Sequence, residues 1–303
     1  PTRRSSDLVL ILGETGTGKE IIASGIHAER HGGRPLPYVT INCTAIPEQL
    51  LESELFGHEK GAFTGATEAR MGKFQLAGDG DILLDEIGDM DLQMQSKLLR
   101  VLESREFERV GGREIIPLRA GIIASTNQNL LAMSERRAFL ADLYYRLSTI
   151  ELYLPPLRAR PEDIPLLIDR LCAQKGGRLR LTSQAMEYLQ RYTWPGNVRQ
   201  LKNLVGRWLV FYDGVQITGR HVVDELTIGQ RSYNEAFGVT APLAGTASPS
   251  GPASAPPPTL ADQERAALEQ ALAYAGGNRA LAARVLGISR TALYQKLERF
   301  RLS

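Results

Sequence analysis

The stretch that decides the fold is LVLILGETGTGKE, residues 8–20. Its apolar beginning predicts a buried strand, which breaks into a glycine-rich loop at Gly13 and continues as a helix from about Glu20 to Ala28. Glycines let backbone N–H groups turn inward without a side chain in the way, and the helix N-terminus adds partial positive charge. Lys19 would reach the outer phosphates. The order of strand, loop and helix therefore predicts a phosphate cradle.

A second stretch, DILLDE at residues 81–86, supplies an apolar strand that ends in acids. A magnesium–nucleotide site needs carboxylates in this position. Together the two stretches favour a nucleotide site over a glycine-rich turn in an ordinary α/β domain. One departure from the generic phosphate loop is Glu20, which stands where a magnesium-binding Ser or Thr is usual.

Composition bounds the class of protein. The chain has 303 residues, 43% apolar and 23% charged, which predicts two or three domains. No apolar run approaches the ~20 residues of a membrane span, and no signal peptide is expected. Cys43 and Cys172 lie far apart, which fits a reduced cytoplasmic setting, with Cys43 a buried small hydrophobe. Residues 1–7 are expected to be a non-native or truncated start, since the chain begins at Pro1 without a methionine.

The pattern along the chain divides it into four parts. Short apolar runs alternate with amphipathic stretches up to about residue 153, which predicts a parallel sheet flanked by helices. The expected strands are 8–12, 38–42, 82–85, 120–126 and 149–153, and the expected helices 19–29, 47–56, 91–104 and 139–146. Helices alone follow, at 162–174, 183–192 and 197–212, and predict a helical lid; Thr182 or Ser183 would cap the second. The domain boundaries predicted are 1–154, 155–230, a disordered Pro/Ala/Ser linker at 231–258, and 259–303.

The last part reads as a helix-turn-helix. Gly287 supplies the turn, Ser289 caps the second helix, and leucines including Leu293 and Leu297 would form a small core. Spacing alone also fits a solvated helical hairpin. Residues 259–303 carry a net charge of +3, from seven Arg/Lys against four Asp/Glu. The candidate DNA contacts are Ser289, Arg290, Thr291, Tyr294 and Lys296.

The stretch ELFGHEKGAFTGA at residues 54–66 resembles the signature loop of bacterial enhancer-binding proteins, the AAA+ ATPases that activate RNA polymerase carrying sigma-54. Glu20 fits this family's phosphate loop. The resemblance runs from about Leu8 to Leu302. It includes LLDEIGD at 83–89, RVGG at 109–112, TN at 126–127, LPPLR at 154–158 and WPGNVRQL at 194–201. It implies an α/β AAA+ domain with a parallel sheet flanked by helices, an α-helical lid, and a small all-α Fis-type helix-turn-helix domain.

The resemblance also implies roles for single residues. Asp85 would hold Mg²⁺, and Glu86 would orient or deprotonate the attacking water. Asn42 matches the residue that hydrogen-bonds this glutamate and toggles it with nucleotide state. Thr126 and Asn127 match the sensor I region, and Arg199 matches sensor II. The residues implied to hold ATP are Gly13, Glu14, Thr15, Gly16, Thr17, Gly18, Lys19, Glu20, Thr126, Asn127 and Arg199.

The loop at residues 61–66 carries one aromatic side chain and one hydroxyl among small residues. The resemblance implies that Phe63 and Thr64 are exposed on a mobile tip that contacts sigma-54. The plainer interpretation is a tight turn with Phe63 buried. The candidate contact residues are Gly61, Ala62, Phe63, Thr64, Gly65 and Ala66.

One segment departs from the family pattern. The family usually has two arginines that reach the neighbouring subunit's nucleotide, and in FLADLYYRL at 139–147 the second stands as Arg146 while Leu140 occupies the first position. An arginine finger contributes ~10³–10⁵ in rate, so the loss of one either reduces hydrolysis severely or leaves Arg146 to carry the role. Arg136 and Arg137 lie just upstream as possible substitutes, although their helical phase is wrong. The expectation is a slow but real ATPase.

The resulting expectation is an ATP-driven transcription activator. It would bind double-stranded upstream DNA, assemble as a ring that is hexameric by family analogy, and remodel sigma-54 RNA polymerase, with ATP and Mg²⁺ as cofactors, no membrane and a cytoplasmic location. Regulation would come from an N-terminal domain that the chain lacks. Two alternatives stay open: a nucleotide-gated DNA-binding regulator with weak or no turnover because of Leu140, and a protein-unfolding AAA+ machine without promoter specificity.

Overall fold

The structure, a computed structural model, describes residues 8–212 and 214–227 together with Leu268, Arg279, Leu293, Leu297 and Phe300. The chain divides into two compact units, Pro1–Thr240 and Ala241–Ser303. The predicted linker and the candidate DNA contacts Ser289, Arg290, Thr291, Tyr294 and Lys296 lie outside the described residues. Among the helices that are described, none is both long enough and apolar enough to cross a lipid bilayer.

A five-stranded parallel sheet forms the centre of the first unit, in the order β2-β5-β8-β1-β9. The strands are β1 (Leu8–Leu12), β2 (Tyr38–Asn42), β5 (Asp81–Asp85), β8 (Gly121–Thr126) and β9 (Glu151–Tyr153). The central strands β5, β8 and β1 are almost entirely buried and have nearly continuous apolar runs, because both faces of the sheet are covered there, whereas the edge strand β9 is exposed. Since all five strands run the same way, their carboxyl ends meet at one edge, which is where ligands bind in open α/β sheets.

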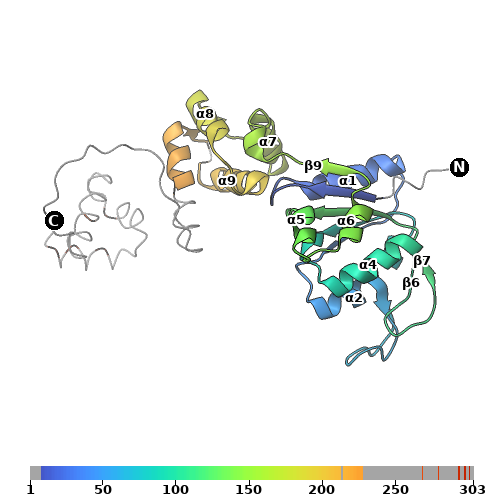
Figure 1. Cartoon of the computed structure of the whole chain (residues 1–303). Helices are drawn as coiled ribbons and strands as arrows, with labels where there is room; N and C mark the ends of the chain where they lie inside the picture. Colours follow the sequence, from blue (N-terminus) through green and yellow to red (C-terminus); the bar gives the residue numbers. More distant parts are fainter. Residues whose placement is uncertain are drawn as a thin grey trace, which may run out of the picture. The chain divides into compact units, whose positions relative to one another are not determined.

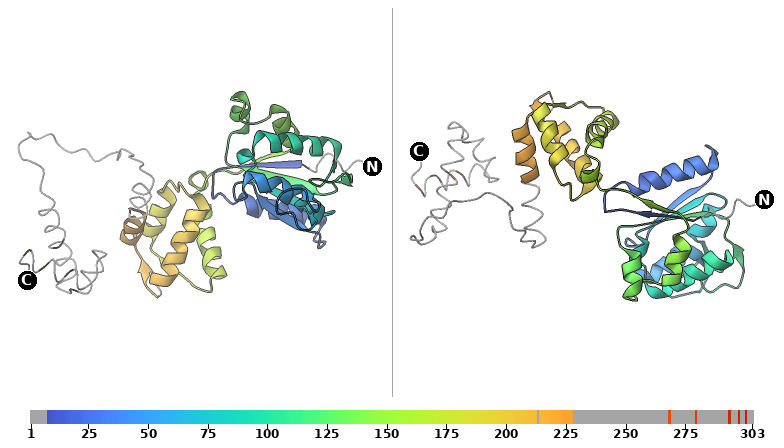
Figure 2. Two further views of the ribbon diagram at one scale, coloured as in Figure 1. Left: turned by 90° about the horizontal axis from the view of Figure 1, so that it is seen from below. Right: turned by 45° about the horizontal axis from the view of Figure 1, so that its top comes forward.

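Helices cover the two faces unequally (Figures 1 and 2). On one face α1 (Lys19–His31) packs through Ala23 against Val9, Leu83 and Ile123. The opposite face carries the larger core, with side chains from five helices. These helices are α2 (Glu48–Phe56), α3 (Lys73–Ala77), α4 (Leu92–Ser104), α5 (Leu130–Glu135) and α6 (Ala141–Leu147). The predicted parallel-sheet α/β fold is confirmed.

Two short antiparallel pairs project from this domain, and no pattern in the sequence predicted them. They are β3 (Gly57–His58) with β4 (Arg70–Met71), and β6 (Glu106–Phe107) with β7 (Ile116–Pro117). The first pair closes the base of the loop at residues 59–69. Gly57 and Gly72 are needed there, because a Cβ on Gly72 would lie 2.3 Å from the Gly57 nitrogen and one on Gly57 would lie 2.4 Å from the Arg70 oxygen.

The helical lid has a core of its own. It comprises α7 (Asp163–Gln174), α8 (Ser183–Arg191) and α9 (Asn197–Phe211), with the small parallel pair β10 (Arg180–Leu181) and β11 (Gln216–Ile217). Trp194 and Trp208 are fully buried at its centre, and the Trp194 indole donates to the Leu189 carbonyl at 2.8 Å. Thr182 caps α8, since its hydroxyl accepts from the Ala185 amide at 3.2 Å.

In the second unit, Leu268, Leu293 and Leu297 are helical and buried. This agrees with the small leucine core expected for residues 259–303.

Candidate nucleotide site and partner-contact loop

The loop between β1 and α1 has the geometry of a phosphate cradle. Gly18 sits at the N-cap of α1 with φ 105°, in a left-handed conformation that favours glycine. The Thr17 hydroxyl donates to the Glu14 carbonyl at 2.8 Å, and this hydrogen bond stabilises the turn of the loop. Lys19 is 6% exposed, and its Nζ donates to the Gly13 carbonyl at 3.0 Å. The loop thus places one ammonium group and the first amides of a helix at the same point.

Asp85 and Glu86 lie at the carboxyl end of β5, which is separated from β1 by β8 in the sheet. The two Asp85 oxygens accept from the Ser125 hydroxyl at 2.5 Å and from the Asn42 amide at 3.2 Å. Glu86 has a left-handed backbone, with φ 53°, which turns it out of the strand. Its Oε1 lies 3.4 Å from the Lys19 ammonium. The Glu86 carboxylate therefore points to Lys19, and Asp85 lines the same cleft.

The Asn42 side chain contacts Asp85 in this structure and not Glu86, the partner that the resemblance implies. Asn42 and Asp85 are direct partners in the register of β2 and β5, so the Asn42 amide meets Asp85 instead. Its Oδ1 accepts from the Thr44 and Ala45 amides at 3.0 and 3.1 Å, which fixes the side chain in a turn at the strand end.

The end of β8 contacts both Glu86 and the phosphate loop. The Asn127 amide donates to Glu86 Oε2 at 3.1 Å, and its side chain donates to the Thr15 hydroxyl at 2.7 Å. Thr126 contributes differently, because it is buried and its hydroxyl accepts from the Gln128 amide. Only its carbonyl reaches the phosphate loop, where it accepts from the Gly13 amide at 3.2 Å.

The lid contacts the phosphate loop through a group of hydrogen bonds. The Arg158 guanidinium donates to both Glu14 oxygens, at 2.8 and 2.5 Å. Buried Asn197 donates to Glu14 Oε2 and to the Thr15 carbonyl, both at 3.1 Å. Arg158 first, and then Asn197, lower the pKa of Glu14 to about 2. The loop is thereby linked to the lid.

Backbone contacts extend this link. The Arg160 guanidinium donates to the Thr17 carbonyl at 2.9 Å, and the Arg199 amide donates to the Gly16 carbonyl at 3.2 Å. A Cβ on Gly16 would lie 2.5 Å from the Gly196 carbonyl, so the lid approaches closely only because residue 16 is glycine. Roles for Arg158, Arg160 and Asn197 were not predicted from the sequence, although two of them lie inside quoted motifs.

These elements line one cleft, whose walls carry three cations and three carboxylates. Lys202 is a further cation that the sequence analysis did not single out. The lining residues include Thr15, Gly16, Gly18, Lys19, Glu20, Asp85, Glu86, Arg199 and Lys202. Basic groups, free amides at a helix start and acids on the facing strand are the features that hold a polyphosphate with a divalent cation. The cleft therefore has the donor and charge pattern that suits a nucleotide.

Arg146 and Leu140 lie away from this cleft. Arg146 Nη2 donates to the Leu102 carbonyl at 2.9 Å, and the residue lines a separate cavity with Leu8, at the opposite end of β1 from the phosphate loop. The Leu140 side chain packs against the main core and its amide donates to Gln95 Oε1 at 2.8 Å. Neither position reaches the nucleotide cleft of its own chain.

The loop at residues 61–66 is a tight turn with an accessible tip. The Gly61 amide donates to the Ala66 carbonyl at 2.8 Å, and the Ala66 amide to the Phe63 carbonyl at 3.0 Å. Phe63 is 38% exposed, and its ring stands edge-on to His58 with centroids 5.1 Å apart. Thr64 is exposed. The turn is as tight as the plainer interpretation expected, but Phe63 is not buried.

Three family profiles match the chain. The sigma-54 interaction domain covers residues 2–153, the AAA+ ATPase lid domain covers 158–237, and the Fis family of bacterial regulatory proteins covers 259–300.

Similar curated proteins include the DNA-binding transcriptional activator HyfR and the regulatory protein AtoC of Escherichia coli K12, and the Nif-specific regulatory protein of Azotobacter vinelandii. Their identities are 41%, 43% and 44%, over 99%, 96% and 93% of this chain. The matches cover 45%, 62% and 52% of those proteins, so the chain spans roughly half to two thirds of their length.

A similar solved structure is NtrX from Brucella abortus in complex with ATP. It is 31% identical with a TM-score of 0.65, over 98% of this chain and 66% of that one. Its complex with ADP gives a TM-score of 0.67 at 32% identity, over 98% of this chain and 64% of that one.

Proposed function

The chain belongs to the family of sigma-54-dependent transcriptional activators with an AAA+ domain and a Fis-type helix-turn-helix, and on this premise we propose that it is an ATP-driven activator of transcription. It would bind upstream DNA through residues 259–303 and use ATP hydrolysis to remodel sigma-54 RNA polymerase. The names of HyfR, a DNA-binding transcriptional activator, and of the Nif-specific regulatory protein support this assignment.

The observation that carries the proposal is the meeting of Lys19, Glu86 and Arg199 in one cleft. These residues come from three different segments: the start of α1, the end of β5 and the lid. A solvated lysine or an acidic residue at a strand end does not by itself indicate a nucleotide site. Their convergence provides what phosphoryl transfer needs, which is positioning and charge compensation.

The donor set suits Mg²⁺ without the usual hydroxyl ligand. Asp85 is the proposed ligand, because an ionised carboxylate has about four acceptor positions and only two are used by Ser125 and Asn42. Glu20 lies in the same cleft and adds a second carboxylate. When bound, Mg²⁺ would supply charge neutralisation for the phosphate oxygens.

The chain's own residues would divide the remaining work. Lys19 and the amides at the start of α1 bind phosphate oxygens. The Asn127 amide orients the Glu86 carboxylate through Oε2, and Oε1 faces Lys19. When Lys19 binds phosphate instead, Oε1 would be available to accept a proton from water. Arg199 would read the outer phosphate and couple it to the lid, whose backbone is already bonded to Gly16.

The remaining parts of the proposal concern assembly and partners. Arg146 lies away from its own cleft, which suits a residue that serves the neighbouring subunit's nucleotide in a ring. The exposed tip at Phe63 and Thr64 suits a contact with sigma-54, since an accessible aromatic side chain is a typical anchor.

Open-complex formation with purified sigma-54 RNA polymerase tests the proposal. Promoter melting is expected with ATP and not with a non-hydrolysable analogue. Melting that is equal with both, or absent with ATP although the protein hydrolyses it, would contradict the proposed motor.

A second candidate function is a nucleotide-gated DNA-binding regulator with little turnover. The observation that favours it is Leu140, which packs into the core at the position of a family arginine. ATP turnover of the assembled protein separates the two, because a gated regulator binds ATP without cleaving it above background.

A further inference from the structure

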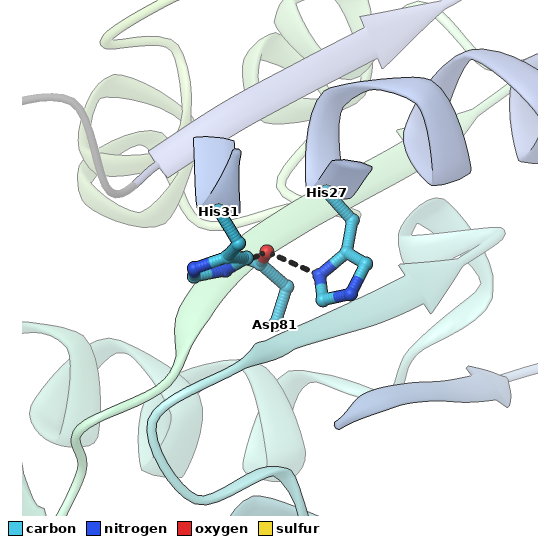
Figure 3. A group of neighbouring side chains, drawn as sticks. All are labelled: His27, His31 and Asp81. Carbon is cyan, nitrogen blue, oxygen red and sulfur yellow. Dashed lines mark hydrogen bonds and ion pairs between the residues drawn. The ribbon is translucent and has the colours of Figure 1, made fainter. Parts of the chain in front are cut away.

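A cluster of metal-ligating side chains lies at the end of the sheet opposite the nucleotide cleft. His27 and His31 stand one turn apart on α1, and Asp81 opens β5 directly beneath them (Figure 3). His27 Nδ1 and His31 Nε2 lie 2.8 and 2.7 Å from the same oxygen, Asp81 Oδ2. All three donor atoms lie within 4.8 Å of one another.

We propose that His27, His31 and Asp81 form a binding site for a transition-metal ion of the Zn²⁺ class. Two histidines at i and i+4 on one helix face, joined by a carboxylate, are a common donor set for zinc, with water in the fourth position. Tetrahedral zinc at ~2.0–2.1 Å from each donor needs the donors about 3.3 Å apart. The two distances from the imidazole nitrogens to Asp81 Oδ2, 2.8 and 2.7 Å, are about half an ångström shorter than that spacing, so a small outward shift of the carboxylate would admit the ion.

The surroundings favour a cation here. Asp81 is fully buried and both imidazoles are at most 14% exposed, so the donors are held in place before an ion arrives. The site lies in the last two turns of α1, whose C-terminal end favours positive charge. Arg30 binds the other Asp81 oxygen, Oδ1, and leaves Oδ2 to the histidines. Arg30 therefore orients the ligand carboxylate and lowers the affinity for a dication without blocking the site.

Glycine at the start of β8 keeps this arrangement possible. A Cβ on Gly121 would collide with both Arg30 Nη1 and Asp81 Oδ1.

Metal binding also requires the imidazole protons to move. An ionised carboxylate only accepts hydrogen bonds, so the ring nitrogens that face Asp81 carry protons in the metal-free protein. Metal binding moves each proton to the other ring nitrogen or releases it to solvent.

The site would connect two elements that lead to the nucleotide cleft. α1 begins at Lys19 and β5 ends at Asp85, while the cluster joins the last turns of α1 to the first residue of β5. A bound ion would thus clamp the two elements at the end remote from the phosphates, as a structural rather than a catalytic ligand.

Cobalt titration of the tag-free, chelator-treated 303-residue chain without nucleotide tests the site. One Co²⁺ per chain should bind with the visible absorption of a four-coordinate ion, and Zn²⁺ should displace it. At a hundredfold excess over Kd, Zn²⁺ should raise Tm by about 5–10 °C. The chain has four histidines, so the two outside the cluster provide matched controls.

His27→Gln, His31→Gln and Asp81→Asn should each weaken binding by about tenfold or more, while His58→Gln and His221→Gln leave it unchanged. His31→Cys should restore binding with a thiolate-to-cobalt charge-transfer band that the wild type lacks, which a merely structural role for His31 would not produce. Asp85→Asn should not alter the titration. Absence of Co²⁺ binding by the wild type, or binding that survives in folded cluster variants, would overturn the proposal.

Discussion

The Glu14 carboxylate accepts two hydrogen bonds from the Arg158 guanidinium, at 2.8 and 2.5 Å, and so joins the phosphate loop to the lid. We expect Arg158→Gln to raise the KM for ATP about tenfold, because the loop loses the contact that fixes it against the lid. Stability should change little, since the two side chains are 46% and 41% exposed and solvent screens the pair. Nucleotide binding and thermal unfolding measure the two effects.

Arg191→Gln is the matched control for this change. Arg191 also belongs to the lid and pairs with Glu187 at 2.7 Å, but on the exposed surface of α8. It should alter neither ATP binding nor turnover. Equal effects of the two variants would show that loss of any lid charge, and not the link to the loop, is responsible.

Acid should remove the contribution of Glu14 to stability. The folded pKa is depressed to about 2, mainly by Arg158, from a usual value of 4.5. A depressed carboxyl pKa stabilises the fold above the unfolded value, and this contribution is lost as pH falls from about 4.5 to about 2. Because the pair is exposed and screened, denaturant unfolding of wild type and Glu14→Gln should differ only slightly at pH 7, and this difference should shrink as pH falls from about 4.5 to about 2. A constant difference from pH 7 to pH 3 would contradict this.

The sequence predicted the sheet well because its strands are continuous apolar runs. The bounds expected for 8–12 and 38–42 match β1 and β2 residue for residue. The short pairs β3–β4 and β6–β7 were missed because two-residue strands show no alternation. In the second unit, the buried Leu293 and Leu297 agree with the expected core.

The candidate site was predicted less completely, because its contacts depend on register and on the lid. Asn42 meets Asp85 and not Glu86, since strand pairing sets them side by side while Glu86 turns away with φ 53°. Glu14 and Arg158 are 144 residues apart in the sequence, and no local sequence pattern predicts their hydrogen bonds. Motifs thus identified which residues gather at the cleft, but only three-dimensional packing could say which of them bond to one another.

Glu86→Gln should separate nucleotide binding from hydrolysis. The variant keeps an acceptor for the Asn127 amide but cannot take a proton from water, so turnover should fall about 10²–10⁴-fold. ATP affinity should hold or rise, because the neutral amide competes less with phosphate for Lys19, now 3.4 Å from the carboxylate. Lys19→Ala is the contrasting variant and should lose binding itself. A Glu86→Gln protein with normal turnover would remove Glu86 from its proposed role.

Arg146→Ala should abolish turnover without affecting ATP binding by the single chain, because Arg146 lies away from its own cleft. The expected loss is about 10³-fold or more. Mixing Arg146→Ala with Lys19→Ala protein gives the sharper test. In a ring, an intact cleft from the first variant can meet an intact arginine from the second, and part of the activity should return. No recovery in mixtures shown to co-assemble would argue that Arg146 does not act between subunits.

Phe63→Ala should uncouple hydrolysis from transcription. Phe63 is 38% exposed and contacts His58 at the edge of its loop, so its removal should cost about 1 kcal/mol of stability or less and leave ATP turnover intact. Open-complex formation should nevertheless fall to background, because the tip would lose its only aromatic anchor within residues 61–66. Met71→Ala is the matched control, an exposed apolar side chain on β4 at the base of the same loop. If both variants retain promoter melting while hydrolysing ATP normally, the tip does not transmit force to sigma-54. If both variants lose promoter melting, the contact requires a stable hairpin and not the aromatic side chain.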